Sequence, residues 1–564
     1  MTAVQGRAPG VEGRAGKFPG PSLMPALNAI QQRHGWLPRE ELVALSREVH
    51  RPLYEIEGLI SFYPHYRTDL PRMVAVHPCH DLACWLAGSQ EGIEELRARY
   101  QADPDVEVRE VSCLGRCDIA PAVAVDERPA PLHQAESLVE VARAGGAPPQ
   151  TSRRAYHAGA WPNDPYAPGE PRYRVLRALL AGELDPAGIA ATLTDAGLRG
   201  MGGAGFPTGK KWELVAGQPA TPKYAIVNAD ESEPGSFKDR EVLFTQPHLV
   251  LEGLLVGMLV VGAEEGTVFV RHEYGPESDA VLAELEALRA DGLLGADVPG
   301  SGRRLSVELF TSPGGYILGE ETALLECLEG HRGEPRNKPP FPGVYGLWGK
   351  PTLINSVETF AHVPVILERG ADWWKAQGRN GATGLKFFAV SGAVRRPGVY
   401  CLPLGTTIGE LLEEAGGMAG GAVLQAVQPG GASSNFLRPD ALDVPMDFTS
   451  LADAGSMLGS GSVVVLAEGV DLLAAATNVL RFFRDESCGK CVPCRVGSAK
   501  AHTILTEAAA DGGLGADEEE RVRQLEETMR LTSICGLGQV ALGPVLSVLG
   551  NQRGGTVARD QPKS

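Results

Sequence analysis

Apolar residues recur at three- and four-residue spacing from Leu23 to about Tyr66, with Pro38 between two such stretches. This period matches one face of an α-helix and proline interrupts helices, so the pattern predicts a short lead-in of separate helices. Two brief apolar runs follow, at 73–76 and 106–111, and we expect each to form a strand. Each run leads into a cysteine, so both cysteine pairs of this region are expected on loops at strand ends.

Apolar runs in the middle of the chain alternate with helical stretches. The runs at 224–227, 266–270 and 305–310 predict strands, and the stretches 246–262 and 277–291 predict helices. Such alternation is typical of an α/β domain.

The rest of the chain divides by the same criteria. Apolar runs at 385–390, 398–402 and 462–466 surround a helical stretch at 408–415, which predicts a small α+β domain before a helical C-terminal segment. The stretch 144–171 is rich in Ala, Gly and Pro without a period, which is typical of a linker. We therefore expect a loose tail, a first domain with its helical lead-in, a linker, three further domains and a second loose tail, at 1–20, 21–145, 146–172, 173–380, 381–467, 468–550 and 551–564.

Composition and charge exclude several classes of function. A net charge of -18 offers no basic surplus for binding a phosphate backbone, so nucleic acid is not an expected partner. The most apolar stretch, 249–262, is too short to span a membrane and contains Glu252, which favours a buried helix. The N-terminus has no apolar core followed by a cleavage site, so we expect no secretory signal and a cytoplasmic location.

Ten cysteines are too few for a disulfide scaffold in 564 residues, and eight of them form two groups. The first group is Cys79-x4-Cys84 followed by Cys113-x3-Cys117. Four-cysteine zinc sites favour shorter pairs, so this spacing favours a [2Fe–2S] cluster over zinc or unliganded thiols, which remain the alternatives.

The second group is Cys488-x2-Cys491-x2-Cys494, with Cys535 further along the chain. Three thiolates at this spacing can bind three corners of a [4Fe–4S] cubane, and a remote cysteine can bind the fourth. The alternative is four buried cysteines, which the intervening Gly, Lys and Pro disfavour. Cys327 and Cys401 are left over and are assigned no function.

Three segments have residues typical of a nucleotide or flavin site. Residues 200–212 contain a G-x-G-x-x-G pattern ahead of a predicted helix, where bare backbone N–H groups can approach phosphate, although a flexible loop has the same composition. The run Asn228 to Glu233 follows a predicted strand, where open α/β sheets bind ligands, although a solvated acidic turn is the alternative. Tyr316-x2-Gly319-Glu320-Glu321 opens a predicted helix, where glutamate is also common for electrostatic reasons alone.

Taken in order, the motifs GLRGMGGAGFPTGKKW, NADESEPGSFKDRE, GGYILGEETALLECLEGHRGEPRNKPPFP, PTLINSVET and ESCGKCVPC resemble the NADH-binding flavoprotein subunit of respiratory complex I. This resemblance covers 175–550. Residues 22–130, with IQQRHGWLP, GLISFYP and the four cysteines, resemble the small thioredoxin-like [2Fe–2S] subunit of the same module. Similar fusions are diaphorase subunits of NAD-reducing hydrogenases and β subunits of molybdenum- or tungsten-dependent formate dehydrogenases. With Met201 where complex I has Arg, the glycine motif more closely resembles that of the formate dehydrogenases.

The resemblance implies a multidomain α/β and α+β fold. It comprises a thioredoxin-like [2Fe–2S] domain within 21–145, a Rossmann-like FMN and NAD domain at 173–380, an SLBB domain of the ubiquitin-like β-grasp type at 381–467, and a helical [4Fe–4S] bundle at 468–550. The implied cluster ligands are Cys79, Cys84, Cys113, Cys117, Cys488, Cys491, Cys494 and Cys535.

The resemblance also implies the cofactor contacts. Those for FMN are Gly200, Gly202, Lys211, Asn228, Asp230, Tyr316, Gly319, Glu320 and Asn355, and those for NAD are Phe206, Glu233, Glu321, Lys338 and Phe341. Gly203, Gly205, Glu231, Ile354 and Ser356 complete the expected cofactor-binding set. Leu214, Ser356 and Val492 depart from the family pattern, and Leu214 weakens the expected stacking on adenine most.

The resemblance implies a diaphorase subunit in which hydride passes directly between NAD and FMN, so no catalytic side chain is expected and Glu233 and Glu321 orient NAD. Carboxylates in this site would repel the 2′-phosphate of NADP. The expected partner is a formate dehydrogenase α subunit with a molybdenum- or tungsten-pterin centre and further clusters. A hydrogenase or complex I-like partner is the alternative, and a non-enzymatic zinc or cluster scaffold, or a redox sensor, is the distant one.

Overall fold

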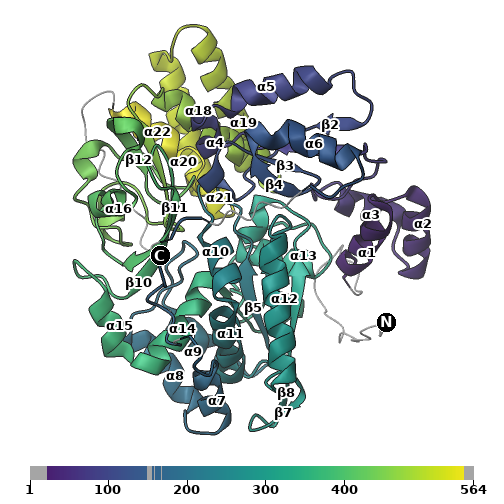
Figure 1. Ribbon diagram of the computed structural model, residues 1–564, viewed down its shortest axis with the longest axis vertical. Coiled ribbons are helices and arrows are strands. Elements are labelled where there is room, and N and C mark those ends of the chain that lie inside the picture. The colour runs from purple at the N-terminus through teal and green to yellow at the C-terminus, as the bar shows by residue number, and fades with distance from the viewer. Residues whose placement is uncertain (1–21, 149–154, 158, 167, 552–564) are drawn as a thin grey trace.

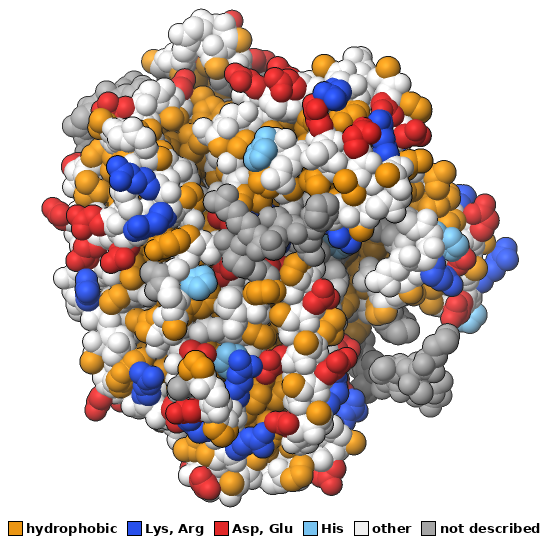
Figure 2. Space-filling model, viewed as in Figure 1, with side chains coloured by type: hydrophobic (Ala, Val, Ile, Leu, Met, Phe, Trp, Pro, Cys, Tyr) orange, Lys and Arg blue, Asp and Glu red, His pale blue; other side chains and the backbone are white. Residues whose placement is uncertain are grey.

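The computed structural model describes residues 22–148, 155–157, 159–166 and 168–551, and Figure 1 shows how its parts pack. The α/β domain at 173–380 (teal), called the flavin domain below because its resemblance implies FMN, lies at the bottom, the later domains (green to yellow) lie above it, and the N-terminal helices (purple) lie at one side. Residues 1–20 and 552–564 of the predicted tails lie outside the described residues. Figure 2 shows Lys and Arg side chains scattered among acidic ones on this face, in keeping with the net charge of -18.

The predicted helical lead-in is confirmed. It consists of three helices, α1 (Met24–His34), α2 (Arg39–Glu48) and α3 (Leu53–Ile60). Pro38 precedes α2 as its N-cap residue, which fits the expected break. The lead-in packs on the flavin domain, where the Tyr63 hydroxyl donates a hydrogen bond to the His331 carbonyl over 2.5 Å.

The first domain contains a four-stranded sheet in the order β2-β1-β3-β4. β1 and β2 are parallel, and the other pairs are antiparallel. Its elements are β1 (Val74–Pro78), α4 (Leu82–Leu86), α5 (Ser89–Tyr100), β2 (Val106–Val108), η1 (Cys117–Ile119), β3 (Ala122–Val125), β4 (Arg128–Pro131) and α6 (Ala135–Arg143).

The placement of the first cysteine group corrects one expectation. Cys79 directly follows β1 and Cys113 lies in the loop beyond β2, as predicted. Cys84, however, lies within α4, and Cys117 begins the short helix η1. Each pair therefore joins a loop that follows a strand to the helix that comes next in the chain.

The flavin domain is built on a sheet in the order β7-β8-β6-β5-β9, parallel except for β7. Its elements are α7 (Arg174–Leu180), α8 (Pro186–Asp195), α9 (Thr208–Ala216), β5 (Tyr224–Ala229), α10 (Lys238–Thr245), α11 (Pro247–Val261), β6 (Glu265–Val270), α12 (Gly275–Ala290), β7 (Gly295–Val298), β8 (Arg303–Thr311), η3 (Tyr316–Gly319), α13 (Glu321–Leu328), β9 (Thr352–Ser356), α14 (Val357–Arg369) and α15 (Ala371–Gln377). The predicted α/β alternation is confirmed. Strand β9, which pairs with β5, was not predicted from its five-residue run.

Helix α11 is the predicted buried helix, and its residues from Pro247 to Met258 are buried. It approaches α14 so closely that a Cβ atom on Gly253 would lie 2.1 Å from the Phe360 carbonyl oxygen. Among the described residues, no single helix is long and apolar enough to cross a membrane. Helices α10 and α11 reach that length only as a pair, which is bent by 91°.

The third domain has a sheet in the order β11-β10-β13-β12, with β10 and β13 parallel. Its elements are β10 (Leu385–Gly392), β11 (Gly398–Pro403), α16 (Ile408–Glu414), β12 (Leu424–Gln428), α17 (Ser450–Asp453) and β13 (Ser462–Ala467). Thr407 and Glu410 form a capping box that starts α16, which explains why this helix was predictable from a short pattern. The helical C-terminal part follows as α18 (Leu472–Asp485), α19 (Val492–Ala510), α20 (Ala516–Thr532), α21 (Gly536–Val540) and α22 (Gly543–Asn551).

The described part of the predicted linker packs against two domains. The Trp161 ring meets the edge of Phe387 in β10, with ring centroids 4.9 Å apart. The Tyr166 hydroxyl donates a hydrogen bond to Glu252 in α11 over 2.6 Å. This segment is irregular, as its composition predicts, yet its aromatic side chains fasten it to the flavin and β-grasp domains.

Candidate functional site

The first cysteine group forms one buried set, with the Cys113 and Cys117 sulfurs 3.6 Å apart. Hydrogen bonds with Cys113 and Cys84, then burial, raise the pKa of Cys79, and hydrogen bonds with Cys117 and Cys79 lower that of Cys113. The backbone N–H groups of Gly115 and Ala122 donate to the sulfurs of Cys113 and Cys84 over 3.3 and 3.4 Å. Four adjacent free thiols with N–H donors on sulfur suit a [2Fe–2S] cluster.

Two buried arginines from the flavin domain reach the loop of this cysteine group. Arg271 donates to the Cys113 carbonyl over 2.7 Å and to the Glu231 carbonyl over 2.6 Å. Arg240 donates to the Gly115 carbonyl over 2.6 Å and pairs with Asp118 at 3.1 Å. Guanidinium groups therefore hold the loop from Cys113 to Asp118, which we call the cluster-type loop. These contacts were not predicted from the sequence, because the arginines lie more than a hundred residues away in the chain.

The second cysteine group gathers at the starts of two helices. Cys491 is the N-cap residue of α19, Cys494 lies in its first turn, and Cys535 is the N-cap residue of α21. A Cβ atom on Gly538 would lie 2.9 Å from the Cβ of Cys494, so the two helix starts are in contact. Burial raises the pKa of Cys494 to about 11 and that of Cys535 to about 12. A bound metal ion would overcome that penalty, because coordination deprotonates a thiol.

The glycine-rich loop lies ahead of α9, as predicted, and its ends are joined by backbone hydrogen bonds. Gly200 donates its N–H to the Phe206 carbonyl over 2.8 Å, and Gly205 donates to the Gly200 carbonyl over 3.2 Å. Gly203 has a φ of 126°, which an L side chain rarely adopts. A Cβ atom on Gly202 would lie 3.2 Å from the Cβ of Ser356, so the loop lies directly against the end of β9.

Two lysines and two glutamates meet beside this loop. Lys338 lies 2.8 Å from Glu320 and 3.7 Å from Glu321, and Lys211 lies 3.9 Å from Glu321. Burial lowers the pKa of Lys211, whereas Glu320 and Glu321 outweigh burial and raise the pKa of Lys338. Glu320 also accepts hydrogen bonds from the first N–H groups of α13, so it is the cap of that helix. Of the two lysines, Lys211 therefore has the weaker ion pair with a carboxylate.

Strand ends β5 and β9 bring the predicted amide and carboxylate groups together. Asn228 donates to the Gly319 carbonyl over 2.9 Å, and Asn355 accepts from the Trp212 indole over 3.1 Å. Ile354 offers its carbonyl to the Lys211 ammonium over 3.0 Å. Asp230 has one buried carboxylate oxygen without a hydrogen-bond partner among the described residues, and burial raises its pKa to about 6. An unpartnered carboxylate oxygen at a strand end fits a site that receives a polar ligand.

Glu231 and Glu233 differ, although they are near neighbours in sequence. The Glu231 carboxylate accepts hydrogen bonds from Ser236, Tyr274 and the backbone N–H groups at the start of α10, so it is committed to the fold. Glu233 accepts from the backbone and the hydroxyl of Ser433 in the β-grasp domain, and burial raises its pKa. The position of Glu233 therefore depends on a later domain, which its local sequence does not reveal.

Tyr316 joins this region to the C-terminal helices. Its backbone N–H donates to Glu486 over 2.8 Å, and its ring meets the edge of Phe482 with centroids 4.9 Å apart. Phe482 lies in the last turns of α18, and Glu486 directly follows this helix, just before the second cysteine group. Along the same side, Lys490 donates to the Pro335 carbonyl over 2.6 Å. The predicted flavin residues and the [4Fe–4S]-type loop thus share one packed boundary.

Large apolar side chains flank the glycine loop and remain exposed. Phe206 is 46% exposed, Leu214 is 54% exposed and Phe341 is 58% exposed. A Cβ atom on Gly343 would lie 3.2 Å from Val215, so the loop that carries Phe341 contacts α9. Exposed aromatic faces beside these polar side chains suit a planar ligand.

Comparison with protein families matches four descriptions along the chain. They are a thioredoxin-like [2Fe–2S] ferredoxin at 17–144, the Nuo51 FMN-binding domain at 193–365, an SLBB domain at 387–433, and the NADH-ubiquinone oxidoreductase-F iron–sulfur binding region at 474–555. The fold class and the cofactor set of FMN, [2Fe–2S] and [4Fe–4S] predicted from the sequence are confirmed.

Individual relatives agree with these matches. The chain is 44% identical over 370 residues to the F 2 subunit of the NADH-quinone oxidoreductase of Rhizobium meliloti, covering 65% of this chain and 87% of the relative. It is 42% identical over 367 residues to the NADP-reducing hydrogenase subunit HndC of Solidesulfovibrio fructosivorans, covering 65% and 74%. Among solved structures, a chain of an NAD⁺-reducing [NiFe]-hydrogenase in the H2-reduced state aligns with a TM-score of 0.85 and 32% identity, covering 95% and 92%.

Proposed function

Because the chain belongs to the family of NADH-quinone oxidoreductase F subunits, joined to a thioredoxin-like [2Fe–2S] domain, we propose that it is the NAD-reducing electron-transfer subunit of a hydrogenase-type complex. The chain is an NADH dehydrogenase (diaphorase) type subunit of a multi-subunit NAD-linked redox complex. The similarity over 92% of a hydrogenase chain, with the N-terminal domain included, is the observation that carries the hydrogenase-type assignment.

The flavin site in this proposal lies between the glycine loop and the ends of β5 and β9. The backbone at Gly200, Gly202, Gly203 and Gly205 would approach the flavin phosphate closely, because it carries no Cβ atoms. Lys211 supplies a cation that Glu321 only partly neutralises at 3.9 Å. The remaining proposed FMN contacts are Asn228, Asp230, Tyr316, Gly319, Glu320, Ile354, Asn355 and Ser356, and Glu231 acts by holding this wall in place.

NAD would lie on the exposed side of that site. Phe206 and Phe341 offer apolar faces for the adenine, and Leu214 adds an aliphatic contact in place of a third ring. Glu233, Glu321 and Lys338 would orient the ribose and the nicotinamide by hydrogen bonds. When bound, FMN accepts or gives two electrons as hydride and exchanges single electrons with iron–sulfur clusters.

The eight cysteines of the two groups are the proposed ligands of the clusters. Cys79, Cys84, Cys113 and Cys117 would bind the [2Fe–2S] cluster, and Cys488, Cys491, Cys494 and Cys535 would bind the [4Fe–4S] cluster. Thiolate ligation needs a reducing compartment, so a cytoplasmic location belongs to the proposal. The predicted domain limits belong to it as well.

The partner subunit is tested by isolating the native complex and measuring NAD⁺ reduction with hydrogen and with formate, together with its metal content. Hydrogen-driven turnover with nickel supports the hydrogenase-type assignment. A formate dehydrogenase partner is the second candidate, favoured by Met201 in the glycine loop. Formate-driven turnover with molybdenum or tungsten would replace the first assignment by the second and leave the diaphorase module unchanged.

A further inference from the structure

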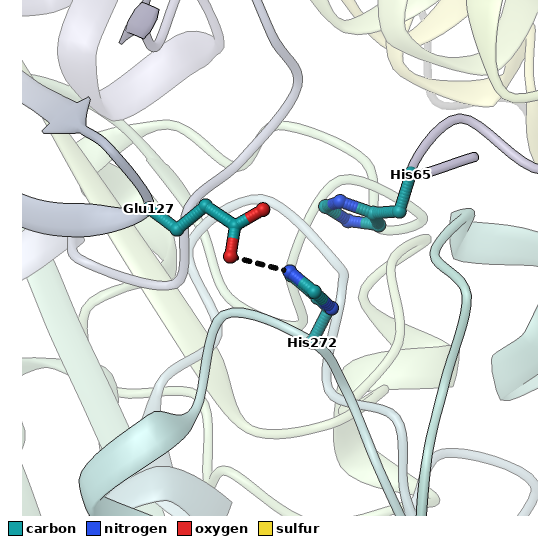
Figure 3. A group of neighbouring side chains, drawn as sticks. All are labelled: His65, Glu127 and His272. Atoms are coloured by element: carbon teal, nitrogen blue, oxygen red, sulfur yellow. Dashed lines mark ion pairs between the residues drawn. The ribbon is translucent and has the colours of Figure 1, made fainter. Parts of the chain in front are cut away.

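Three side chains from distant parts of the chain converge outside the cofactor site (Figure 3). His65 lies in the loop after α3, Glu127 lies at the tip of the β3–β4 hairpin, and His272 lies just beyond β6. One nitrogen of each histidine and one carboxylate oxygen of Glu127 lie within 4.8 Å of one another. We call this group the interdomain triad, because its members come from the helical lead-in, the thioredoxin-like domain and the flavin domain.

Backbone turns and close packing position the triad side chains next to one another. The hairpin that carries Glu127 turns through two non-glycine residues with positive φ, Asp126 at 46° and Glu127 at 64°. Asp126 fixes this turn by accepting a hydrogen bond from the Ala75 N–H over 2.9 Å. His65 packs on Gly314, where a Cβ atom would lie 2.1 Å from the imidazole Cδ2. A side chain at 314 would therefore displace His65 from the triad.

One donor atom of the triad is buried without a hydrogen bond, and the His65 Nε2 lies 3.7 Å from a fourth side chain, Glu273. The His272 Nε2 lies 3.0 Å from a Glu127 oxygen, yet it is buried and has no hydrogen-bond partner in the described part of the chain. The rings of His65 and His272 stack with centroids 4.0 Å apart. This 3.0 Å ion pair has a separation that also fits two ligands of one ion, because bonds of about 2.0 Å at a tetrahedral centre separate ligand atoms by about 3.3 Å.

A second cluster of carboxylates and histidine serves as a contrast. Glu326, Glu329 and His331 also lie close together. Arg336, however, pairs with Glu326 at 2.6 Å and with Glu329 at 2.8 Å, so that cluster already contains its cation. At the interdomain triad, the arginine that precedes His272 in the chain, Arg271, is engaged with Glu273 at 2.9 Å.

We propose that His65, Glu127 and His272 bind one Zn²⁺ ion that fastens the helical lead-in and the thioredoxin-like domain to the flavin domain. Two imidazoles and a carboxylate are a donor set that zinc accepts, and the fourth position is open to water. Ligands on one zinc ion are at most about 4.2 Å apart, so binding requires a small closure and a turn of the stacked rings. The Glu127 side chain, which is 61% exposed, has room to move.

The ion would act beside the cluster-type loop. His272 directly follows Arg271, whose guanidinium donates to the Cys113 carbonyl. Zinc at the triad would therefore hold the strand end from which this contact is made. In this proposal zinc takes no part in hydride transfer. The proposal therefore does not depend on which partner subunit binds the chain.

The test uses the full chain with its flavin and clusters, produced without a histidine tag and treated with a mild chelator. Isothermal titration with Zn²⁺ is compared for wild type, His272→Ala, Glu127→Gln and the control His133→Ala, which removes an exposed histidine of the thioredoxin-like domain. Iron and flavin contents establish that each variant is folded. All variants keep the eight cluster-type cysteines, so zinc bound there contributes equally.

The expected result is one tight site per chain in wild type and His133→Ala. Binding should weaken at least tenfold in both triad variants, and zinc should raise the melting temperature of wild type and the control only. Glu127→Gln keeps the test valid if His272→Ala fails to fold, because Glu127 lies on an exposed hairpin tip. Equal zinc binding in wild type and the triad variants, or no binding in wild type, would overturn the proposal.

Discussion

Glu233 illustrates how a single carboxylate acquires a role from its surroundings. It follows strand β5 in an acidic run, yet its donors come from Ser433, two hundred residues later in the chain. Its neighbour Glu231 is committed to the start of α10 by several hydrogen bonds. Of these two carboxylates, Glu233 is the one that contacts a second domain, and we propose it as the one that meets NAD.

Replacing Glu233 by Gln should therefore weaken NADH binding while FMN stays bound. A hydrogen bond to a charged group contributes about 1.5 to 3 kcal/mol, so we expect the KM for NADH to rise about tenfold or more with a smaller change in kcat. The measurement is steady-state NADH oxidation with an artificial acceptor, together with the flavin content. Glu264→Gln, at an exposed position before β6, is the control, and an unchanged KM in Glu233→Gln would remove Glu233 from the NAD site.

At the scale of residues, the sequence predicted which side chains belong to a site better than it predicted which residues contact them. The two cysteine groups come together as their spacing predicts, because ligands close in sequence are carried by one turn. The partners of Glu233, Tyr316 and Cys113 were not predictable, since Ser433, Glu486 and Arg271 reach them only after the domains pack. The hairpin residue Glu127 gave no local signal at all.

Secondary structure elements were predicted where period and length were both clear. Helix α11 and strands β5, β6 and β8 follow from segments rich in apolar residues. Short strands such as β9 were missed, because a five-residue run between loops has no distinct pattern. The linker was predicted from composition alone, and composition does not reveal that Tyr166 donates to Glu252 inside α11.

This contact predicts a pH dependence of stability. Burial raises the pKa of Glu252 to about 7, although Tyr166 and the Leu176 N–H both donate to it. The folded state therefore holds a proton that the unfolded state releases near pH 4.5, so this group destabilises the fold increasingly as pH rises from about 4.5 to 7. The loss reaches as much as about 3 kcal/mol above pH 7.

Glu252→Gln removes this titration. We expect the melting temperature of the variant, relative to wild type, to increase as pH rises from 5 to 8, whatever constant offset the substitution causes at pH 5. Thermal unfolding followed across this range measures the difference. Glu264→Gln, which changes an exposed carboxylate, should show no such trend. A difference that does not vary with pH would show that Glu252 is ionised throughout.

The whole molecule is organised so that both cysteine groups contact the flavin domain through buried polar groups. Asn478 and Arg481 of α18 donate to the His80 carbonyl over 3.0 and 2.7 Å, which ties the thioredoxin-like domain to the C-terminal helices. Arg240 and Arg271 tie it to the flavin domain. Buried polar contacts of this kind contribute little net stability, and we expect these to hold the two cysteine groups in one position relative to the flavin domain.

Arg271 is the most informative of these contacts, because its charge lies against the cluster-type loop and is almost completely buried. A buried cation favours the reduced, more negative form of a nearby cluster, so Arg271→Met should lower the midpoint potential of the [2Fe–2S] centre. A loss of about 1 kcal/mol of this stabilisation corresponds to about 40 mV for a one-electron couple. Arg271→Lys keeps the charge and should recover part of the shift.

Redox titration followed by electron paramagnetic resonance separates this electrostatic effect from a structural one. Arg177→Met, which removes a surface cation paired with Asp291, is the control and should leave the potential unchanged. A purely structural contact would lower the iron content in Arg271→Met and Arg271→Lys alike without moving the potential of the remaining clusters. A lower potential in Arg271→Met with full iron content, and partial recovery with lysine, is the result that the buried guanidinium predicts.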